Sequence, residues 1–288
     1  MKNIALLLLL TRTCMSFDIP KTSCNSDLTI DKNHYNKTKI YDVGFAYPTD
    51  AHYDTYGNLF FVLFGRNFFG YHFDVKVIKN NATEPEDVPG LPEGKSYSIA
   101  VDKKAAKVYF GTNKGIFLYN YESKNATLVS KPDLKLNNLY LDKDGNKYIT
   151  DSSDGNEELY LLTGDKRIRF RSLDALSEMA IDENNNFYYI KESKLYVLKS
   201  NISRSMLIGN VTYDGIAQIS FYEETVFVAS KHVSYIHEND TGPLKLVKNI
   251  SEIITAISFD HSGNFVLGSY GKISKYETQD NECYQRKN

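Results

Sequence analysis

A pattern that recurs about every forty residues is the feature that most constrains the fold of this chain. In each unit an apolar stretch leads to an anchor position, a short polar turn follows, and a strand rich in aromatic and β-branched residues comes next. The anchors are Asp54, Asp102, Asp142, Asp182, Tyr222 and Asp260, separated by 48, 40, 40, 40 and 38 residues. A period of this length is typical of repeat architectures built from one supersecondary unit.

Each unit reads as four short strands in which apolar and polar residues alternate, with Gly, Asn and Asp between the strands. The second unit shows this most clearly, and its strands are expected over 98–101, 108–111, 115–121 and 127–130. No segment carries a sustained helical apolar stripe. Six four-stranded units predict an all-β chain that folds as a six-bladed β-propeller.

The sixth unit lacks a sequence for its outer strand, because little chain remains after 272–276. The segment 38–43 precedes the first unit and is strand-like. We predict that this N-terminal strand joins the last blade and closes the ring, which removes the two open edges of a linear array. Residues 17–288 are then a single propeller domain.

The N-terminus has the pattern of a secretory signal peptide: a positive residue, Lys2, precedes an apolar run at 4–10 and small residues follow. Seven apolar residues are too few to cross a bilayer. We expect residues 1–16 to be removed after Ser16 and the protein to be secreted. In an alternative, Cys14 would be the lipidated residue of a bacterial lipoprotein, which Arg12 just before it disfavours.

Potential N-glycosylation sites support secretion, because Asn-X-Ser/Thr occurs more often than the three or four times expected by chance from about 25 × 40/288. The acceptors are Asn36, Asn81, Asn125, Asn201, Asn210, Asn239 and Asn249. Four of them, Asn81, Asn125, Asn201 and Asn239, fall near turns between third and fourth strands. We expect those turns to lie opposite the mouth of the central channel.

Two cysteines, Cys24 and Cys283, remain after removal of the signal peptide. If both termini lie on the last blade, these residues are close enough to form a disulfide that latches the ring in an oxidising compartment. The alternative is a pair of unpaired or intermolecular thiols.

Charge and motifs exclude several classes of function. Lys plus Arg is 34 and Asp plus Glu is 36, so a net charge of −2 gives no general attraction for nucleic acid or for anionic membranes. Residues 142–146 resemble the start of a calcium loop, but Lys147 and Ser153 stand where an EF-hand needs Gly and Glu. The chain has neither a His-Glu-X-X-His nor a Gly-X-Ser-X-Gly motif, and we expect no metal and no cofactor.

The ligand site of a propeller usually surrounds the channel where the innermost strands begin. Counting back four or five residues from the anchors gives a ring of positions that is mostly polar and uncharged. Its candidate ligand-binding residues are Asp50, Tyr97, Ser98, Asn137, Asn138, Glu178, Gln218 and Thr255. Such a lining can hydrogen-bond a polar aromatic molecule but offers little general acid or base for catalysis.

Several segments carry a family likeness. They are 97–102 (Tyr-Ser-Ile-Ala-Val-Asp), 108–116 (Val-Tyr-Phe-Gly-Thr-Asn-Lys-Gly-Ile), 125–127 (Asn-Ala-Thr) and 256–269 (Ala-Ile-Ser-Phe-Asp-His-Ser-Gly-Asn-Phe-Val-Leu-Gly-Ser). In these segments, in size and in repeat phase the chain resembles the ommochrome-binding proteins of lepidopteran haemolymph. The resemblance implies a secreted, non-catalytic carrier of ommochrome pigments, such as ommatin or xanthommatin, or of related tryptophan-derived metabolites. We expect a monomer.

Two other functions remain open on the same scaffold. Regucalcin-like lactonases hold a divalent metal with Glu, Asn and Asp in the channel, and Asp50, Asn137 or Asn138, and Glu178 could imitate that set. The Asn-Gly and Asp-Gly steps expected beside such ligands are missing. A secreted protein-interaction module is the third possibility, but the short connectors offer little surface for it.

Overall fold

The computed structural model describes residues 26–68, 70–131, 136–151, 158–164, 166–170, 173, 176–213, 215–238, 240 and 242–279. The predicted signal peptide, Cys24, Cys283 and Asn239 lie outside the described residues. Residues 26–279 form one compact unit. Its regular elements are β-strands, and none of the described segments is a helix long and apolar enough to span a membrane.

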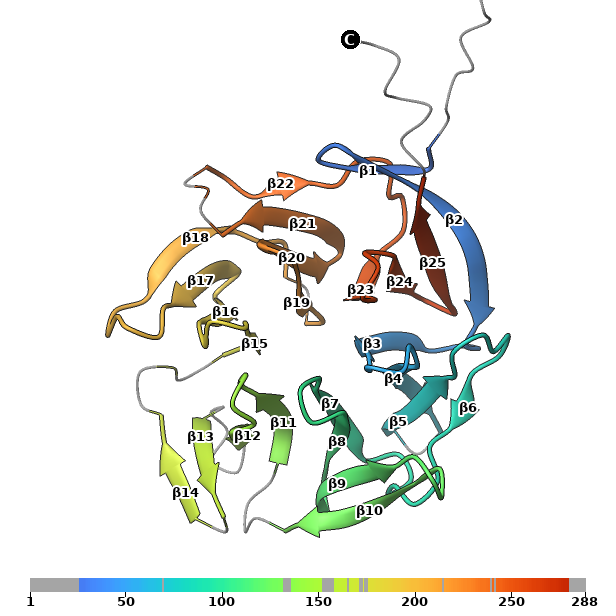
Figure 1. Ribbon diagram of the computed structural model, residues 1–288, viewed down its shortest axis with the longest axis vertical. Helices are drawn as coiled ribbons and strands as arrows, with labels where there is room; N and C mark the ends of the chain where they lie inside the picture. Colours follow the sequence, from blue (N-terminus) through green and yellow to red (C-terminus); the bar gives the residue numbers. More distant parts are fainter. Residues whose placement is uncertain are drawn as a thin grey trace, which may run out of the picture. The chain divides into compact units, whose positions relative to one another are not determined.

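The strands form six antiparallel sheets around a common centre, as Figure 1 shows, so the predicted six-bladed propeller is confirmed. The first blade contains β3 (Tyr47–Tyr53), β4 (Leu59–Asn67), β5 (Gly70–Ile78) and β6 (Glu86–Asp87). The second contains β7 (Ser96–Asp102), β8 (Lys107–Thr112), β9 (Gly115–Asn120) and β10 (Asn125–Ser130). The third contains β11 (Leu136–Leu141), β12 (Lys147–Asp151), β13 (Glu158–Thr163) and β14 (Lys166–Arg169).

The fourth blade contains β15 (Glu178–Ile181), β16 (Phe187–Lys191), β17 (Lys194–Leu198) and β18 (Met206–Asn210). The fifth contains β19 (Gln218–Tyr222), β20 (Thr225–Ser230), β21 (His232–His237) and β22 (Lys245–Leu246). The sixth contains β23 (Ile254–Phe259), β24 (Phe265–Ser269) and β25 (Lys272–Thr278), followed in the sheet by β2 (Asn33–Asp42) and β1 (Leu28–Ile30). The innermost strand of each blade contacts that of the next, and β23 contacts β3, so the ring is closed.

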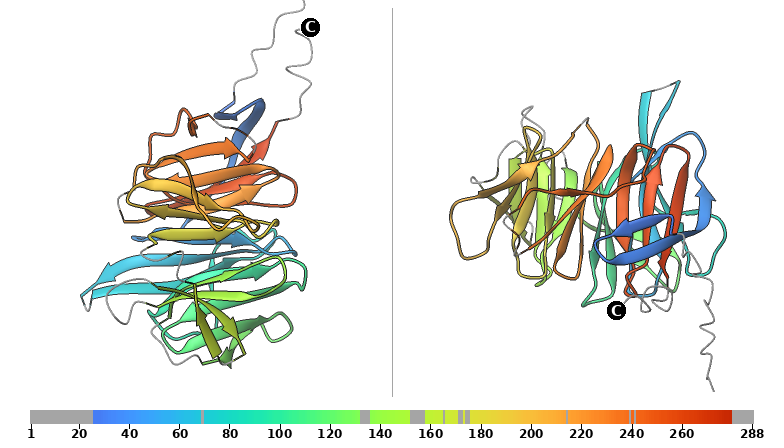
Figure 2. Two further views of the ribbon diagram at one scale, coloured as in Figure 1. Left: turned by 90° about the vertical axis from the view of Figure 1, so that its left-hand side faces the viewer. Right: turned by 90° about the horizontal axis from the view of Figure 1, so that it is seen from above.

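The N-terminal closure is confirmed and is larger than expected. Strand β2 pairs antiparallel with β25, with Tyr41 opposite Ile273, and supplies the outer strand that the sixth unit lacks. The chain also contributes β1, which pairs with β2 as a fifth strand. Figures 1 and 2 show this hairpin (blue) crossing the outer edge of the sixth blade (red).

The core consists of six hydrophobic clusters, one at each interface between neighbouring blades. Aromatic side chains supply much of it, as expected for a chain without Trp. Phe60 of the first blade lies 5.9 Å from Phe110 of the second, between ring centroids, and both are fully buried. Large rings suit this position because they fill the wedge between two twisted sheets.

The antiparallel order gives the ring two faces. The turns between first and second strands, and in the first five blades those between third and fourth strands, lie at one end of the blades, which we call the turn face. The connectors between blades, and the turns between second and third strands, lie at the other end, which we call the connector face. The innermost strand of every blade therefore runs from the connector face to the turn face. Five of these strands follow the connector from the preceding blade, and β3 follows the connector from β2.

Candidate ligand-binding site

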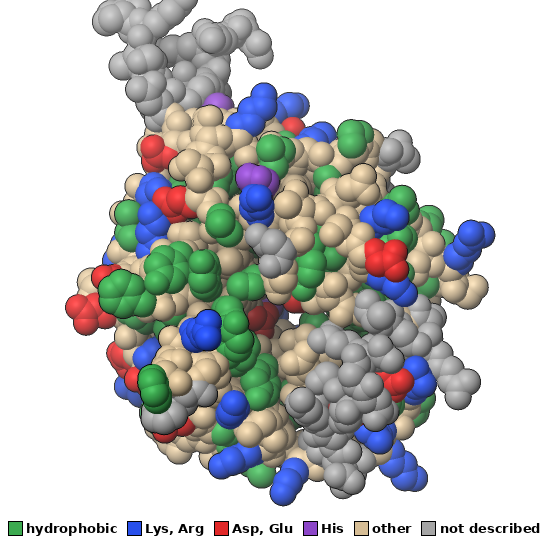
Figure 3. Space-filling view, turned by 180° about the vertical axis from the view of Figure 1, so that it is seen from behind, with side chains coloured by type: hydrophobic (Ala, Val, Ile, Leu, Met, Phe, Trp, Pro, Cys, Tyr) green, Lys and Arg blue, Asp and Glu red, His purple; other side chains and the backbone are tan. Residues whose placement is uncertain are grey.

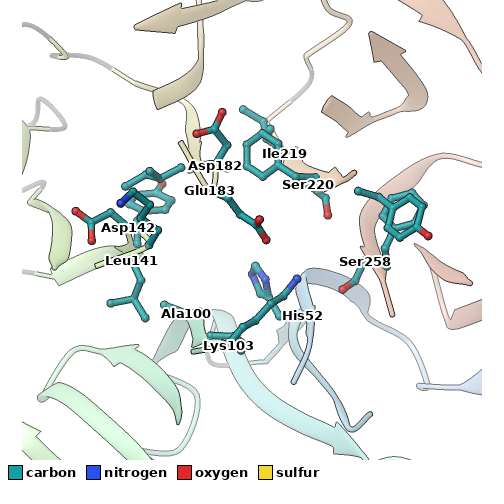
Figure 4. Close-up of a pocket in the computed structure, with 18 of the residues that line it drawn as sticks. His52, Ala100, Lys103, Leu141, Asp142, Asp182, Glu183, Ile219, Ser220 and Ser258 are labelled. Carbon is teal, nitrogen blue, oxygen red and sulfur yellow. The ribbon is translucent and has the colours of Figure 1, made fainter. Parts of the chain in front are cut away.

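A cavity of about 870 Å³ lies at the centre of the ring and is lined by the innermost strand of every blade. Figure 4 shows side chains from different blades converging on it. The cavity extends from the middle of these strands to the turns that follow them, so its mouth is on the turn face. Exposed side chains such as Lys103 and Glu183 form the rim.

Apolar side chains form part of the cavity wall. Ile99, Leu139, Met179 and Ile219 line it, each contributed by the innermost strand of a different blade, and all four are buried. Aromatic side chains line it nearer the turns: Tyr53, Tyr140, Phe221, Tyr222 and Phe259. Burial raises the pKa of the Tyr53 phenol far above its usual range, so this group stays neutral and acts as a hydrogen-bonding group.

The turns at the rim owe their shape to the Asp and Asn of the repeat. In the fourth blade, one carboxylate oxygen of Asp182 accepts hydrogen bonds from the backbone N–H groups of Asn184 and Asn186, both at 2.8 Å. The other oxygen accepts from the Asn186 amide at 2.7 Å. Asp54, Asp142 and Asp260 make the same set of bonds in their turns. Asp142 therefore shapes a turn, as its sequence indicates.

The Asn of this turn also ties the turn to the end of the third strand. The side-chain oxygen of Asn186 accepts a hydrogen bond from the backbone N–H of Ser200 at 3.1 Å. Asn58 and Asn264 accept in the same way from Asn80 and Thr278. The rim is consequently held by bonds within each of these blades, which makes the mouth a fixed frame.

Two carboxyl groups, those of Asp182 and Glu238, are neighbours at the rim between the fourth and fifth blades. Burial is the main cause that raises the pKa of Glu238, and the neighbouring Asp182 carboxylate, to which it is hydrogen-bonded, raises it further. Asp102, Asp142 and Asp260 at the rim accept backbone hydrogen bonds within their own turns.

Three of the eight predicted ligand-binding residues line the cavity: Asp50, Glu178 and Gln218. The other five, Tyr97, Ser98, Asn137, Asn138 and Thr255, lie in or at the edge of the inner strands but not in its lining. The predicted ring surrounds the beginning of the strands at the connector face, whereas the lining of the cavity continues to their ends and to the turns that follow.

Several of the predicted residues join neighbouring blades. Asp50 accepts a hydrogen bond from the backbone N–H of Ile99 in the next blade. Ser98 likewise accepts from Leu139 at 2.9 Å. The Thr255 hydroxyl donates to the carbonyl of Pro48 at 2.6 Å. In the described chain, neighbouring blades are separate sheets and do not pair by strand-to-strand hydrogen bonds. These side chains supply hydrogen bonds between the blades instead.

Gln218 makes the most extensive of these links. Its side-chain amide donates to the Ala51 carbonyl at 2.7 Å, and its oxygen accepts from the backbone N–H groups of Ala51 and Ile257 at 3.1 and 3.0 Å. The side chain is 2% exposed. A single residue of the fifth blade therefore holds the inner strands of the sixth and first blades together.

Apart from Asp50 and Glu178, the charged residues of the cavity were not predicted from the sequence, and β-bulges explain part of this. The register of the inner strand shifts between Thr49 and His52, and Asp50 there has a φ of 43°. Related shifts occur between Ser96 and Ser98 and in β11 and β23. Because a bulge changes which side chains face the axis, counting back from the anchor assigns some positions to the wrong surface.

His52 is the clearest example of a missed residue. Its ring Nε2 lies 2.7 Å from Asp50 Oδ1, and the ring points into the cavity together with Lys103 and Glu183, as Figure 4 shows. His52 stands two residues before the anchor, Asp54, so counting back only two positions would have found it. Within the described parts of the chain, no group of three His, Cys, Asp or Glu residues is arranged to hold a metal ion.

The potential glycosylation sites have a different relation to the mouth from the one expected. Asn81, Asn125 and Asn201 follow third strands and therefore lie on the turn face, the same face as the mouth of the cavity. Asn81 and Asn201 are exposed, but Asn125 is half-buried and its side-chain oxygen is buried. Glycans at the first two sites would extend from the outer part of this face, two strands away from the rim.

The connector face has an aromatic character instead. Figure 3 views the molecule from the side opposite to Figure 1 and shows hydrophobic side chains gathered beside a central hollow. Tyr47 and Tyr270 are 4.9 Å apart here between ring centroids, and Tyr97 packs edge-on against Phe73 at 5.2 Å. Tyr97 thus contributes to a surface cluster on this face.

The comparisons with known proteins identify the fold. No family model matches the sequence, and no curated protein sequence matches it. Among solved structures, a gluconolactonase from Xanthomonas campestris has a TM-score of 0.67 at 12% identity, over 89% of this chain and 96% of that chain. The chain is a six-bladed β-propeller. The nidogen/laminin complex contains a chain with a TM-score of 0.54 at 11% identity, over 68% of this chain and 77% of that chain. At these identities the likeness concerns the fold alone.

Proposed function

We propose that this protein is a secreted, non-catalytic carrier that binds an ommochrome pigment or a related tryptophan-derived aromatic metabolite in its central cavity. The expected setting is extracellular, in haemolymph, and the expected form is a monomer. The proposal rests on the sequence resemblance together with the shape and chemistry of the cavity.

The observation that carries the proposal is the cavity itself. Its volume of about 870 Å³ is in the range of small-molecule sites, about 300–1,000 Å³. Apolar residues such as Leu139 and Ile219 would contact the faces of a flat ring system. His52 and Lys103 supply polar contacts at the edge of that ring, which suits a flat molecule with a few polar substituents.

The test is binding of a xanthommatin-type pigment to the full mature chain. We expect the pigment to raise the midpoint of thermal unfolding in proportion to the logarithm of its concentration above Kd, because it binds only the folded state. We also expect protein purified from its natural source to show a chromophore band. A colourless natural preparation whose unfolding midpoint is unaffected by the pigment would contradict the proposal.

A matched pair of variants locates the binding. Ser220 lines the cavity, so Ser220→Phe narrows it and should weaken pigment binding at least about tenfold. Ser123 is exposed in the turn between β9 and β10, so Ser123→Phe should leave binding unchanged. Equal affinities of the two variants would place the pigment outside the cavity.

A metal-dependent lactonase is the second candidate, because the gluconolactonase has the same fold over most of its length and because both Asp50 and Glu178 line the cavity. Asp50, however, already accepts a hydrogen bond from Ile99 and contacts His52. Turnover of a sugar lactone that is abolished by a chelator and by Glu178→Gln would favour this candidate over the carrier.

A further inference from the structure

His52 is a polar side chain of the cavity wall that is held in place by a second residue of the same wall. Its Nε2 lies 2.7 Å from Asp50 Oδ1, and the two side chains are 32% and 26% exposed. Asp50 is itself fixed, since its other oxygen accepts the backbone N–H of Ile99. The ring is therefore oriented before any ligand arrives, which is the property of a binding group rather than of a mobile surface residue.

The Asp50 carboxylate determines which nitrogen of His52 carries the proton. An ionised carboxylate can only accept hydrogen bonds, so the ring nitrogen that contacts it must be the donor. Nε2 then bears the hydrogen, and in a neutral imidazole Nδ1 has the free lone pair. Among the described residues the only hydrogen-bond partner of the His52 side chain is Asp50, so Nδ1 is available as an acceptor.

From this geometry we infer that His52 determines the ligand class of the cavity, and that the ligand is an aromatic ring carrying a hydroxyl group that donates a hydrogen bond to His52 Nδ1. The inference rests on the proposed function, because it concerns the same cavity. It adds that phenolic ligands are selected over the corresponding molecules without the hydroxyl. The selectivity arises because a ligand without a donor leaves the oriented Nδ1 desolvated and without a partner.

The test compares two flat tryptophan-derived acids that differ by one ring hydroxyl, xanthurenic acid with the hydroxyl and kynurenic acid without it. Binding to the full mature chain is measured by titration calorimetry at about pH 8, where histidine side chains are in general neutral. We expect the wild-type protein to bind xanthurenic acid about fivefold to tenfold more tightly than kynurenic acid.

His52→Phe keeps a flat ring but removes Nδ1, so its affinities for the two acids should be equal. His232 is exposed in β21 and is not among the residues that line the cavity. The control His232→Phe should therefore keep the wild-type preference. A second variant, Asp50→Asn, tests the tautomer: the Asn amide can donate to Nε2, which leaves the hydrogen on Nδ1 and removes the preference for a donor.

The results separate this inference from the proposed function. Equal affinities of the wild-type protein for the two acids would overturn the inference, and so would an unchanged preference in His52→Phe. If the wild-type protein binds a xanthommatin-type pigment in either case, the carrier proposal still holds. If it binds neither acid and no pigment at millimolar concentration, both proposals are wrong.

Discussion

The hydroxyl of Tyr235 in the fifth blade accepts a hydrogen bond at 3.2 Å from the backbone N–H of Asp31, which lies 204 positions earlier in the chain. This contact marks where the N-terminal hairpin reaches past its own blade. Leu28 and Ile30 of β1 are buried in the cluster between the fifth and sixth blades, together with Phe227. The N-terminus therefore closes the ring twice, by pairing with β25 and by covering the neighbouring interface.

Removing a buried side chain of β1 should destabilise the whole ring. Leu28 is 2% exposed, so Leu28→Ala creates a cavity in this cluster and should lower the free energy of unfolding by about 3 kcal/mol. Thr29→Ala, at the exposed position between the two buried ones, should change it by less than about 0.5 kcal/mol. Urea unfolding measures both, and similar values would show that β1 is not part of the cooperative unit.

Gln218 should contribute to stability rather than only to ligand contact. Gln218→Met keeps the size of the side chain but leaves the N–H and carbonyl of Ala51 and the N–H of Ile257 without their partner. At about 1–3 kcal/mol for each buried polar group, we expect a loss of at least about 3 kcal/mol in urea unfolding. Ser220→Ala, two residues along the same strand, is the control and should be nearly neutral. A Gln218→Met variant as stable as the wild type would contradict the contribution of Gln218 to stability.

The strands were predictable from the sequence because each depends on a local pattern. The Asp at four anchors and the Asn four residues later specify the turn by hydrogen bonds within five residues, as between Asp182 and Asn186. The pairing of residues 38–43 with the last blade was predictable because the sixth unit lacks an outer strand, which leaves one edge of its sheet unpaired. The short strand Leu28–Ile30 was missed because three residues carry too little periodicity, and its burial depends on a blade 200 residues away.

The site was less predictable because it depends on register and on the direction of the channel. Asp50, Glu178 and Gln218 were placed on the axis correctly, whereas Ser98 and Thr255 bond to the adjacent blade. The bulge beside Asp50 brings His52 to the cavity wall, and no regular alternation indicates it. Which end of the channel holds the cavity depends on side-chain packing over all six blades, which a local pattern does not contain.

Glu238 should make stability depend on pH. Its pKa is raised in the folded protein by burial and by Asp182, so the folded state holds this proton more tightly than the unfolded state does. Stability then decreases as the pH rises through the raised pKa, because ionisation leaves two carboxylates side by side. Glu238→Gln should therefore stabilise the protein more at pH 7 than at pH 4.

Urea unfolding of wild type and variant at the two pH values measures this difference. Glu122→Gln, in an exposed turn of the second blade, is the control for the loss of one charge. A stabilising effect of Glu238→Gln that is the same at pH 4 and pH 7 would mean that the carboxyl pair is not the cause.

The predicted disulfide between Cys24 and Cys283 concerns the two segments that flank the described unit. Leu28 and Thr278 both pair with Tyr35 of β2, one from each side. The backbone N–H of Asp27 donates to the Tyr35 carbonyl at 3.0 Å, and the backbone N–H of Gln279 donates to the His34 carbonyl at 2.9 Å. The described chain therefore begins and ends at neighbouring positions of the sixth blade. Cys24 stands four residues before Leu28 in the sequence and Cys283 five residues after Thr278, and a bond between them stays a prediction.

A double-mutant cycle tests the bond by its energy. In the chain-entropy model a bridge that closes a loop of about 259 residues stabilises the fold by about 5 kcal/mol. Cys24→Ser and Cys283→Ser should each remove this stabilisation, and the double variant should lose no more than either single variant, because one bond is broken in all three. Peptide mapping without reduction should find the two cysteines in one linked fragment. If both thiols can be alkylated in the native protein and the single variants unfold like the wild type, the ring is closed by β1 and β2 alone.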